Sequence, residues 1–222
     1  MTIKYPYSRQ YLDSKDISSV IRTLKSKVIA RGNKINEFEK NICKFVGVKY
    51  AVAVNSATSG LHIACLALNL KKNDTIWTVP NTFVASANAG LYCGSKIDFV
   101  DIEYDTGNID VTKLEKKLKT SKIKPKVLIP VHFSGQPTDQ EKIYKLSKKY
   151  NFKIVEDASH SLGAKRDNIK VGNCRWSNIT VFSFHPVKII TTGEGGIAVT
   201  NDKRLYERLK IFRNHGITKN LN

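Results

Sequence analysis

The alternation of short apolar runs with amphipathic stretches is the feature that most constrains the fold of this chain. Helix-like stretches occupy residues 58–68, 84–92, 112–118 and 138–149, and they separate the first five apolar runs. Strands that alternate with helices indicate βαβ units around a mostly parallel sheet flanked by helices, which is an α/β fold. The predicted strands are residues 50–54, 75–79, 97–100, 126–131, 153–156, 179–184 and 196–200.

The two ends of the chain carry different signals. The last predicted strand, residues 196–200, follows its predecessor through a glycine-rich connection without a helix, so we expect it to run antiparallel. Asp202 then precedes a final helix as its N-cap. Near the N-terminus, Asp13 precedes one amphipathic helix and Gly47 ends a second. We expect one domain over all 222 residues, in which residues 1–50 form an N-terminal lead-in.

The charge of the chain is unusual, because 37 Lys and Arg residues against 19 Asp and Glu residues give +18. Such a charge raises the question of a nucleic-acid partner. Only eight of the basic residues are arginine, the side chain that makes bidentate base and phosphate contacts. The densest lysine run, residues 113–126, has no interleaved aromatic residues for base stacking. We interpret the charge as a lysine-rich solvated surface and expect no nucleic-acid partner.

Several other classes of protein are excluded by simple patterns. The apolar runs are too short to span a bilayer, and the N-terminus lacks the apolar segment of a signal peptide. The cysteines form no CxxC pair and have no histidine at ligand spacing. We therefore expect a cytoplasmic protein without a membrane partner, a metal site or disulfides. The four expected free thiols are Cys43, Cys65, Cys93 and Cys174.

Small residues and one aromatic residue follow the first two predicted strands, at the sheet edge where open α/β folds bind ligands. Ser56, Ala57 and Thr58 open a helix, whose free backbone N–H groups and dipole can hold an anion. The alternative is a simple helix cap by Ser56 or Thr58. Phe83 follows residues 75–79, where its ring could cover a planar ligand or belong to the core.

An acid and a lysine follow two later strands. Asp157 comes after residues 153–156, and burying it is costly unless it meets a cation or hydrogen-bond donors. The Asp157 carboxylate could pair with a pyridinium nitrogen, or it could accept hydrogen bonds from the next turn as a cap. Lys188 follows residues 179–184 among apolar and small residues, where desolvation would lower its pKa and make it a nucleophilic amine. The alternative is a surface lysine. Together these sites are the parts of a pyridoxal phosphate site.

Four sequence blocks carry a family resemblance. They are VAVNSATSGLHIACLAL, VPNTFVASANA, IVEDASHSLGA and FSFHPVKIITTGEGGIAVTND. They resemble the DegT/DnrJ/StrS family of sugar aminotransferases, and the resemblance covers nearly the whole chain. It implies the large domain of a fold-type-I enzyme that uses pyridoxal 5′-phosphate (PLP).

The resemblance implies a role for individual residues. Lys188 would form a Schiff base with the cofactor and move a proton, Asp157 would keep the ring nitrogen protonated, and His160 would lie near the ring. These three are the expected catalytic residues. The other expected cofactor contacts are Ser56, Ala57, Thr58 and Ser183 around the phosphate and Phe83 on the ring face. The expected substrate contacts are Tyr5, Tyr7 and His185, and for His185 a structural hydrogen bond is an equal alternative.

The implied reaction is a ping-pong transfer of an amino group from L-glutamate to a 4-keto-6-deoxy sugar carried on a nucleotide, of the UDP-linked pseudaminic-acid type. Members of the family continue past the point where this chain ends, into a smaller C-terminal domain, and they act as homodimers. We therefore expect that the small domain is absent here. A weakly active or vestigial fragment is the main alternative. A second alternative is a related pyridoxamine-phosphate dehydratase, but such an enzyme would carry histidine at the position of Lys188. A third alternative is a nucleic-acid binder, which only the charge of the chain suggests.

Overall fold

A seven-stranded mixed sheet organises the computed structural model, which describes residues 8–217. The strand order is β1-β9-β8-β5-β4-β2-β3. All neighbouring strands are parallel except β9, which pairs antiparallel with both β1 and β8, as the helix-free connection predicted. The strands are β1 (Tyr50–Val54), β2 (Thr75–Thr78), β3 (Lys96–Phe99), β4 (Val127–Leu128), β5 (Lys153–Asp157), β8 (Ile179–Ser183) and β9 (Gly196–Thr200).

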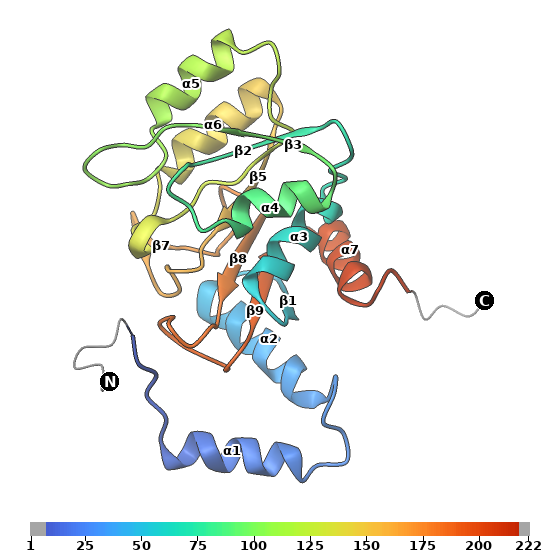
Figure 1. The fold of residues 1–222 in the computed structure, drawn as a ribbon. Coiled ribbons are helices and arrows are strands. Elements are labelled where there is room, and N and C mark those ends of the chain that lie inside the picture. Colours follow the sequence, from blue (N-terminus) through green and yellow to red (C-terminus); the bar gives the residue numbers. More distant parts are fainter. Residues whose placement is uncertain (1–7, 218–222) are drawn as a thin grey trace, which may run out of the picture.

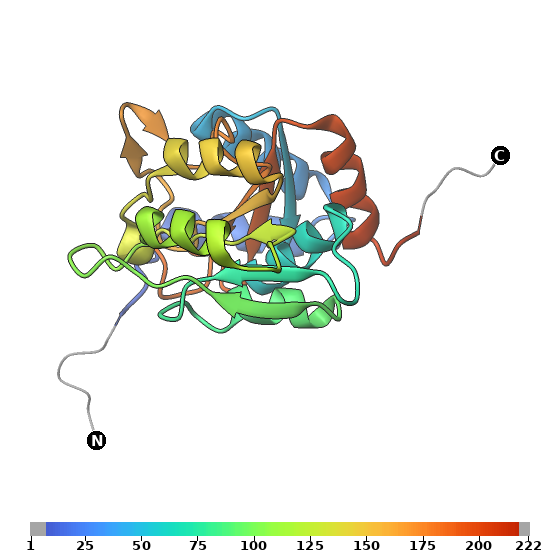
Figure 2. The ribbon, with the colours of Figure 1, turned by 90° about the horizontal axis from the view of Figure 1, so that it is seen from above.

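Helices cover both faces of this sheet, so its central strands are buried on both sides and read as continuous apolar runs. One face packs against α3 (Ala57–Ala67), α4 (Ala85–Tyr92) and α7 (Lys203–Arg213). The other face packs against α5 (Val111–Thr120) and α6 (Gln140–Tyr150) at one end and against α2 (Asn33–Val46) at the other. Seen from above, α5 and α6 lie side by side (Figure 2). None of the helices within residues 8–217 is long and apolar enough to cross a membrane.

The N-terminal segment forms the two predicted helices. Asp13 caps α1 (Ser14–Leu24) with a capping box, and Gly47 ends α2 in the left-handed conformation with φ +78°. Helix α2 contributes Ile42 and Val46 to the core. Helix α1 buries none of its residues and lies apart from the sheet (Figure 1), so its apolar side faces outward.

Two local features differ from the predictions. The predicted strand 126–131 is shortened to β4, because Pro130 has no N–H to donate to a ladder and the chain then departs, touching Asp157 through a single bridge at Val131. A small hairpin was not predicted. It joins β6 (Lys165–Arg166) to β7 (Ile169–Lys170), and its two turn residues both have positive φ.

Candidate active site

One cavity of about 600 Å³ lies at the carboxyl ends of β1, β2, β5 and β8. Its position agrees with the rule that open α/β sheets bind ligands at this edge. The two tyrosines expected at the substrate, Tyr5 and Tyr7, lie outside the residues that the structure describes. All the other predicted site residues line this cavity: Ser56, Ala57, Thr58, Phe83, Asp157, His160, Ser183, His185 and Lys188.

The start of α3 forms one wall. The Ser56 hydroxyl caps the helix by accepting a hydrogen bond from Ser59 N at 3.2 Å. The first two backbone N–H groups of the helix, those of Ala57 and Thr58, have no hydrogen-bond partner within the part of the chain that the structure describes. The predicted cap and the predicted anion cradle are therefore compatible. Gly196 makes this packing possible, because a Cβ there would lie 2.4 Å from the Ser56 carbonyl carbon.

Asp157 ends β5 at the floor of the cavity, with 4% of its surface exposed. Its Oδ1 accepts hydrogen bonds from Ser159 N at 3.1 Å and Ser159 Oγ at 2.6 Å, which is the predicted turn cap. Its Oδ2 accepts a third hydrogen bond from Ser86 Oγ at 2.6 Å. Three donors thus compensate the burial of the carboxylate, and both oxygens are held in place.

Lys188 is half-buried and faces the same cavity, so it is not a solvated surface lysine. Burial lowers the pKa of its amine, and the nearby Asp157 carboxylate opposes that shift. The pKa of His160 is also lowered, by burial and then by the Lys188 charge, against the opposing effect of Asp157. The imidazole of His160 is therefore neutral at pH 7.

Phe83 and His185 flank the opening. Phe83 is 74% exposed on the turn before α4, which excludes the core alternative and leaves its ring free to cover a ligand. His185 accepts a hydrogen bond from Val187 N at 3.4 Å through Nδ1, and its Nε2 lies 3.8 Å from Glu194 Oε1. These contacts support the structural alternative for His185, although its ring also lines the cavity.

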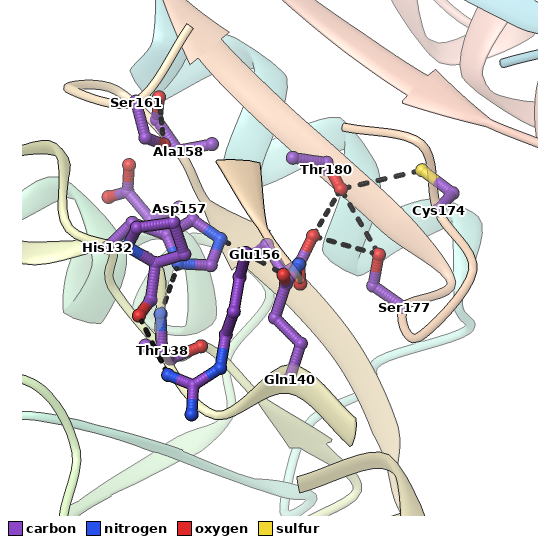
Figure 3. Close-up of polar contacts among 12 residues, drawn as sticks. His132, Thr138, Gln140, Glu156, Asp157, Ala158, Ser161, Cys174, Ser177 and Thr180 are labelled. Atoms are coloured by element: carbon purple, nitrogen blue, oxygen red, sulfur yellow. Dashed lines mark hydrogen bonds and ion pairs between the residues drawn. The ribbon is translucent and has the colours of Figure 1, made fainter. Parts of the chain in front are cut away.

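Behind the cavity, Glu156 points to the opposite side of β5 from Asp157 (Figure 3). Glu156 is 1% exposed and accepts hydrogen bonds from Gln140 Nε2 at 2.5 Å, Thr180 Oγ1 at 2.5 Å and Ser177 Oγ at 3.0 Å. Burial raises the pKa of Glu156, but the surrounding donors outweigh burial and hold it below its usual range. This cluster anchors the strand that presents Asp157.

His132 joins this buried cluster to the cavity floor. Its Nδ1 accepts a hydrogen bond from Thr138 N at 3.0 Å, so its hydrogen is on Nε2, which lies 3.8 Å from Glu156 Oε1. Its backbone N–H donates to Asp157 O at 3.1 Å. His132, Glu156 and Ser86 were not predicted, because the contacts that tie them to the site join residues 16 to 71 positions apart.

The sequence profile of one family matches residues 10–222. The chain belongs to the DegT/DnrJ/EryC1/StrS aminotransferase family. It is 44% identical over 213 residues to a UDP-4-amino-4,6-dideoxy-N-acetyl-β-L-altrosamine transaminase of Campylobacter jejuni, with 96% of this chain and 56% of that protein covered. This chain thus spans little more than half the length of that relative.

Solved structures that are similar to this chain have the same fold. The PseC aminotransferase of Helicobacter pylori, involved in pseudaminic acid biosynthesis, superimposes with a TM-score of 0.88 at 38% identity, over 98% of this chain and 58% of that one. DesV of S. venezuelae, solved with a ketimine intermediate, superimposes with a TM-score of 0.85 at 28% identity, over 93% and 54%. The expected fold of a PLP aminotransferase large domain is confirmed, and PLP is the cofactor of this family.

The described residues fit that cofactor. The unpartnered N–H groups at the start of α3 suit the phosphate, the exposed ring of Phe83 suits a stacked pyridine, and the fully bonded Asp157 carboxylate suits a ring nitrogen. Lys188, with its lowered pKa, supplies the amine.

Proposed function

We propose that this chain is the cofactor-binding large domain of a PLP-dependent sugar aminotransferase. The observation that carries the proposal is the pairing, across one cavity, of a half-buried lysine of lowered pKa with a buried carboxylate that accepts three hydrogen bonds. When bound, PLP supplies an electron sink for the bond-breaking step. The reaction would transfer an amino group from L-glutamate to a keto sugar.

Each residue of the cavity has a part in this mechanism. Asp157 offers an acceptor to the ring nitrogen, because its own oxygens are oriented by hydroxyl donors. The Lys188 amine would take the proton from the substrate carbon and return it, and its lowered pKa favours the neutral form that can accept a proton. The N–H groups of Ala57 and Thr58 would hold the phosphate, together with Ser183. The Phe83 ring would cover the cofactor ring and exclude water, and His160 would lie near that ring.

The sugar substrate follows from the names of the relatives. The C. jejuni relative is named for a UDP sugar that carries its amino group at C4 and lacks a hydroxyl at C6. We therefore propose a UDP-linked 4-keto-6-deoxy sugar as acceptor, with Tyr5, Tyr7 and His185 as candidate contacts. We also propose that the complete enzyme is cytoplasmic and homodimeric.

Two alternatives have distinct predictions. A weakly active fragment would bind PLP without completing the half-reaction, and this alternative rests on the length of the chain relative to its relatives. A pyridoxamine-phosphate dehydratase would have no Schiff-base lysine, which the placement of Lys188 in the cavity opposes.

Borohydride trapping tests the proposal. The purified chain is mixed with PLP, reduced, digested and mapped by mass spectrometry, with Lys188→Arg as the test variant and the exposed Lys165→Arg as the matched control. We expect the label on Lys188 in the wild-type chain and the control, and its loss in Lys188→Arg. A label distributed over surface lysines would contradict the proposal. Adding L-glutamate should then convert the bound cofactor to its amine form, and binding without conversion would favour the weakly active fragment.

A further inference from the structure

The carboxylate of Asp157 has one hydrogen-bond partner that its own turn does not provide. Ser159 is two residues away and belongs to that turn, whereas Ser86 is 71 residues away on α4. Ser86 is fully buried, and its Oγ lies 2.6 Å from Asp157 Oδ2. This contact therefore exists only because the helix after β2 packs over the end of β5.

The direction of the hydrogen bonds around Ser86 can be deduced. A carboxylate only accepts, so Ser86 uses its single hydroxyl proton on Asp157. Thr82 Oγ1 lies 2.7 Å from Ser86 Oγ, and Thr82 must therefore be the donor in that contact. The alternative acceptor for Thr82, Phe83 O, is farther at 3.1 Å. The resulting series of hydrogen bonds runs from Thr82 to Ser86 to Asp157.

This series of hydrogen bonds begins on the turn that carries Phe83. Thr82 and Phe83 both line the cavity, and Asp157 lies at its floor. Consecutive hydrogen bonds polarise one another in a buried site, so the Thr82 donor strengthens the bond from Ser86 to the carboxylate. The turn and the carboxylate thus hold each other in one arrangement.

We propose that Ser86, oriented by Thr82, is a positioning residue that holds the Asp157 carboxylate aimed at the cofactor ring nitrogen. The inference deepens the proposed function and rests on it for the identity of the ring. Its consequence is that the charge on the bound ring depends on a hydroxyl that never touches the cofactor.

The test compares Ser86→Ala and Thr82→Val with Ser95→Ala. Ser95 is a matched control, because it is buried just after the far end of the same helix and donates to Gly90 O at 2.9 Å, away from Asp157. The first readout is the pH titration of the absorbance of PLP linked to Lys188. A ring that holds its proton less firmly lets the linked Lys188 nitrogen keep its own proton to higher pH.

We expect Ser86→Ala to raise the titration midpoint by about 0.5 to 1 pH unit. Thr82→Val should raise it by less, and Ser95→Ala should not move it. The double variant should match Ser86→Ala alone, because without Ser86 the Thr82 hydroxyl no longer reaches the carboxylate. A midpoint in Ser86→Ala equal to that of Ser95→Ala would overturn the proposal, as would additive effects in the double variant.

A second readout needs no cofactor. In urea unfolding of the chain without PLP at pH 7, Ser86→Ala should lower the midpoint more than Ser95→Ala, because it removes a hydrogen bond to a buried carboxylate rather than one to a backbone carbonyl. Equal losses in the two variants would refute the inference. If Ser86→Ala is destabilised more than Ser95→Ala but the wild-type chain shows no label on Lys188, the proposed function fails. The series of hydrogen bonds from Thr82 to Asp157 is then still supported.

Discussion

Replacing Glu156 by glutamine tests the buried cluster behind the cavity. The amide has nearly the same shape, so no cavity is created. Its oxygen can still accept from Gln140, and its NH₂ group can donate to Ser177 and Thr180, whose hydroxyls can turn to accept. What disappears is the charge that strengthens these three bonds.

The size of the effect follows from those bonds. A charge-assisted hydrogen bond contributes about 1 kcal/mol more than a neutral one, so three of them lose about 3 kcal/mol. Burying a neutral amide instead of a carboxylate recovers part of this loss. We expect Glu156→Gln to lower the free energy of unfolding by about 2 kcal/mol at pH 7.

The pH dependence has a definite sign. Because the pKa of Glu156 is lower in the folded chain than in the unfolded chain, the ionised side chain stabilises the fold above its unfolded pKa, and this contribution disappears as the pH falls through the folded pKa. The difference between wild type and Glu156→Gln should therefore be largest near neutral pH and should shrink below about pH 4. The other carboxylates are common to both proteins and cancel.

Urea unfolding at several pH values, followed by circular dichroism, measures this difference. The exposed Glu141→Gln is the matched control and should stay within about 0.5 kcal/mol of wild type. A difference for Glu156→Gln that does not shrink as the pH falls below about 4 would refute the reasoning, and so would a variant as stable as the control.

Two further predictions concern the cavity. Gly196→Ala should lose about 3 kcal/mol of stability, because its Cβ would meet the Ser56 backbone at 2.4 Å. Gly193→Ala meets no atom of residues 8–217 within 4 Å but has a φ of +79°, and it should lose about 1 kcal/mol. Equal losses in thermal unfolding would contradict this steric argument. The imidazole of His160 should titrate below its ordinary pKa of 6.5 in NMR spectra, and Lys188→Met should raise that midpoint by removing a neighbouring charge; a midpoint unmoved by Lys188→Met would argue against the proximity of the two side chains.

Most of the fold could be predicted because its signals are local. Asp13 and Gly47 mark helix ends by their own side-chain and backbone chemistry, and the central strands are apolar throughout because helices cover both faces. The prediction was less accurate at β4, where Pro130 ends the ladder, and at the β6–β7 hairpin, whose strands have only two residues each. Strands this short carry too few residues to show an alternating pattern.

The predicted site residues could be named because each follows a strand. Asp157 and Lys188 sit at the carboxyl ends of β5 and β8, so a correct reading of the strands already placed them at one sheet edge. Ser86 and His132 could not be found in this way. Their positions carry no local signal, since a serine in a helix and a histidine after a short strand have many ordinary roles.

The sequence by itself determined which residue types stand at the sheet edge, and therefore the family and the chemistry that these residues support. Local patterns were sufficient because strand ends, helix caps and glycine turns depend on neighbouring residues. Only the tertiary structure decided how the carboxylates are held. Ser86 reaches Asp157 across 71 residues, and Gln140 and Thr180 reach Glu156 from a helix and a neighbouring strand. Such contacts depend on how helices and strands pack in space, and no spacing along the chain encodes them.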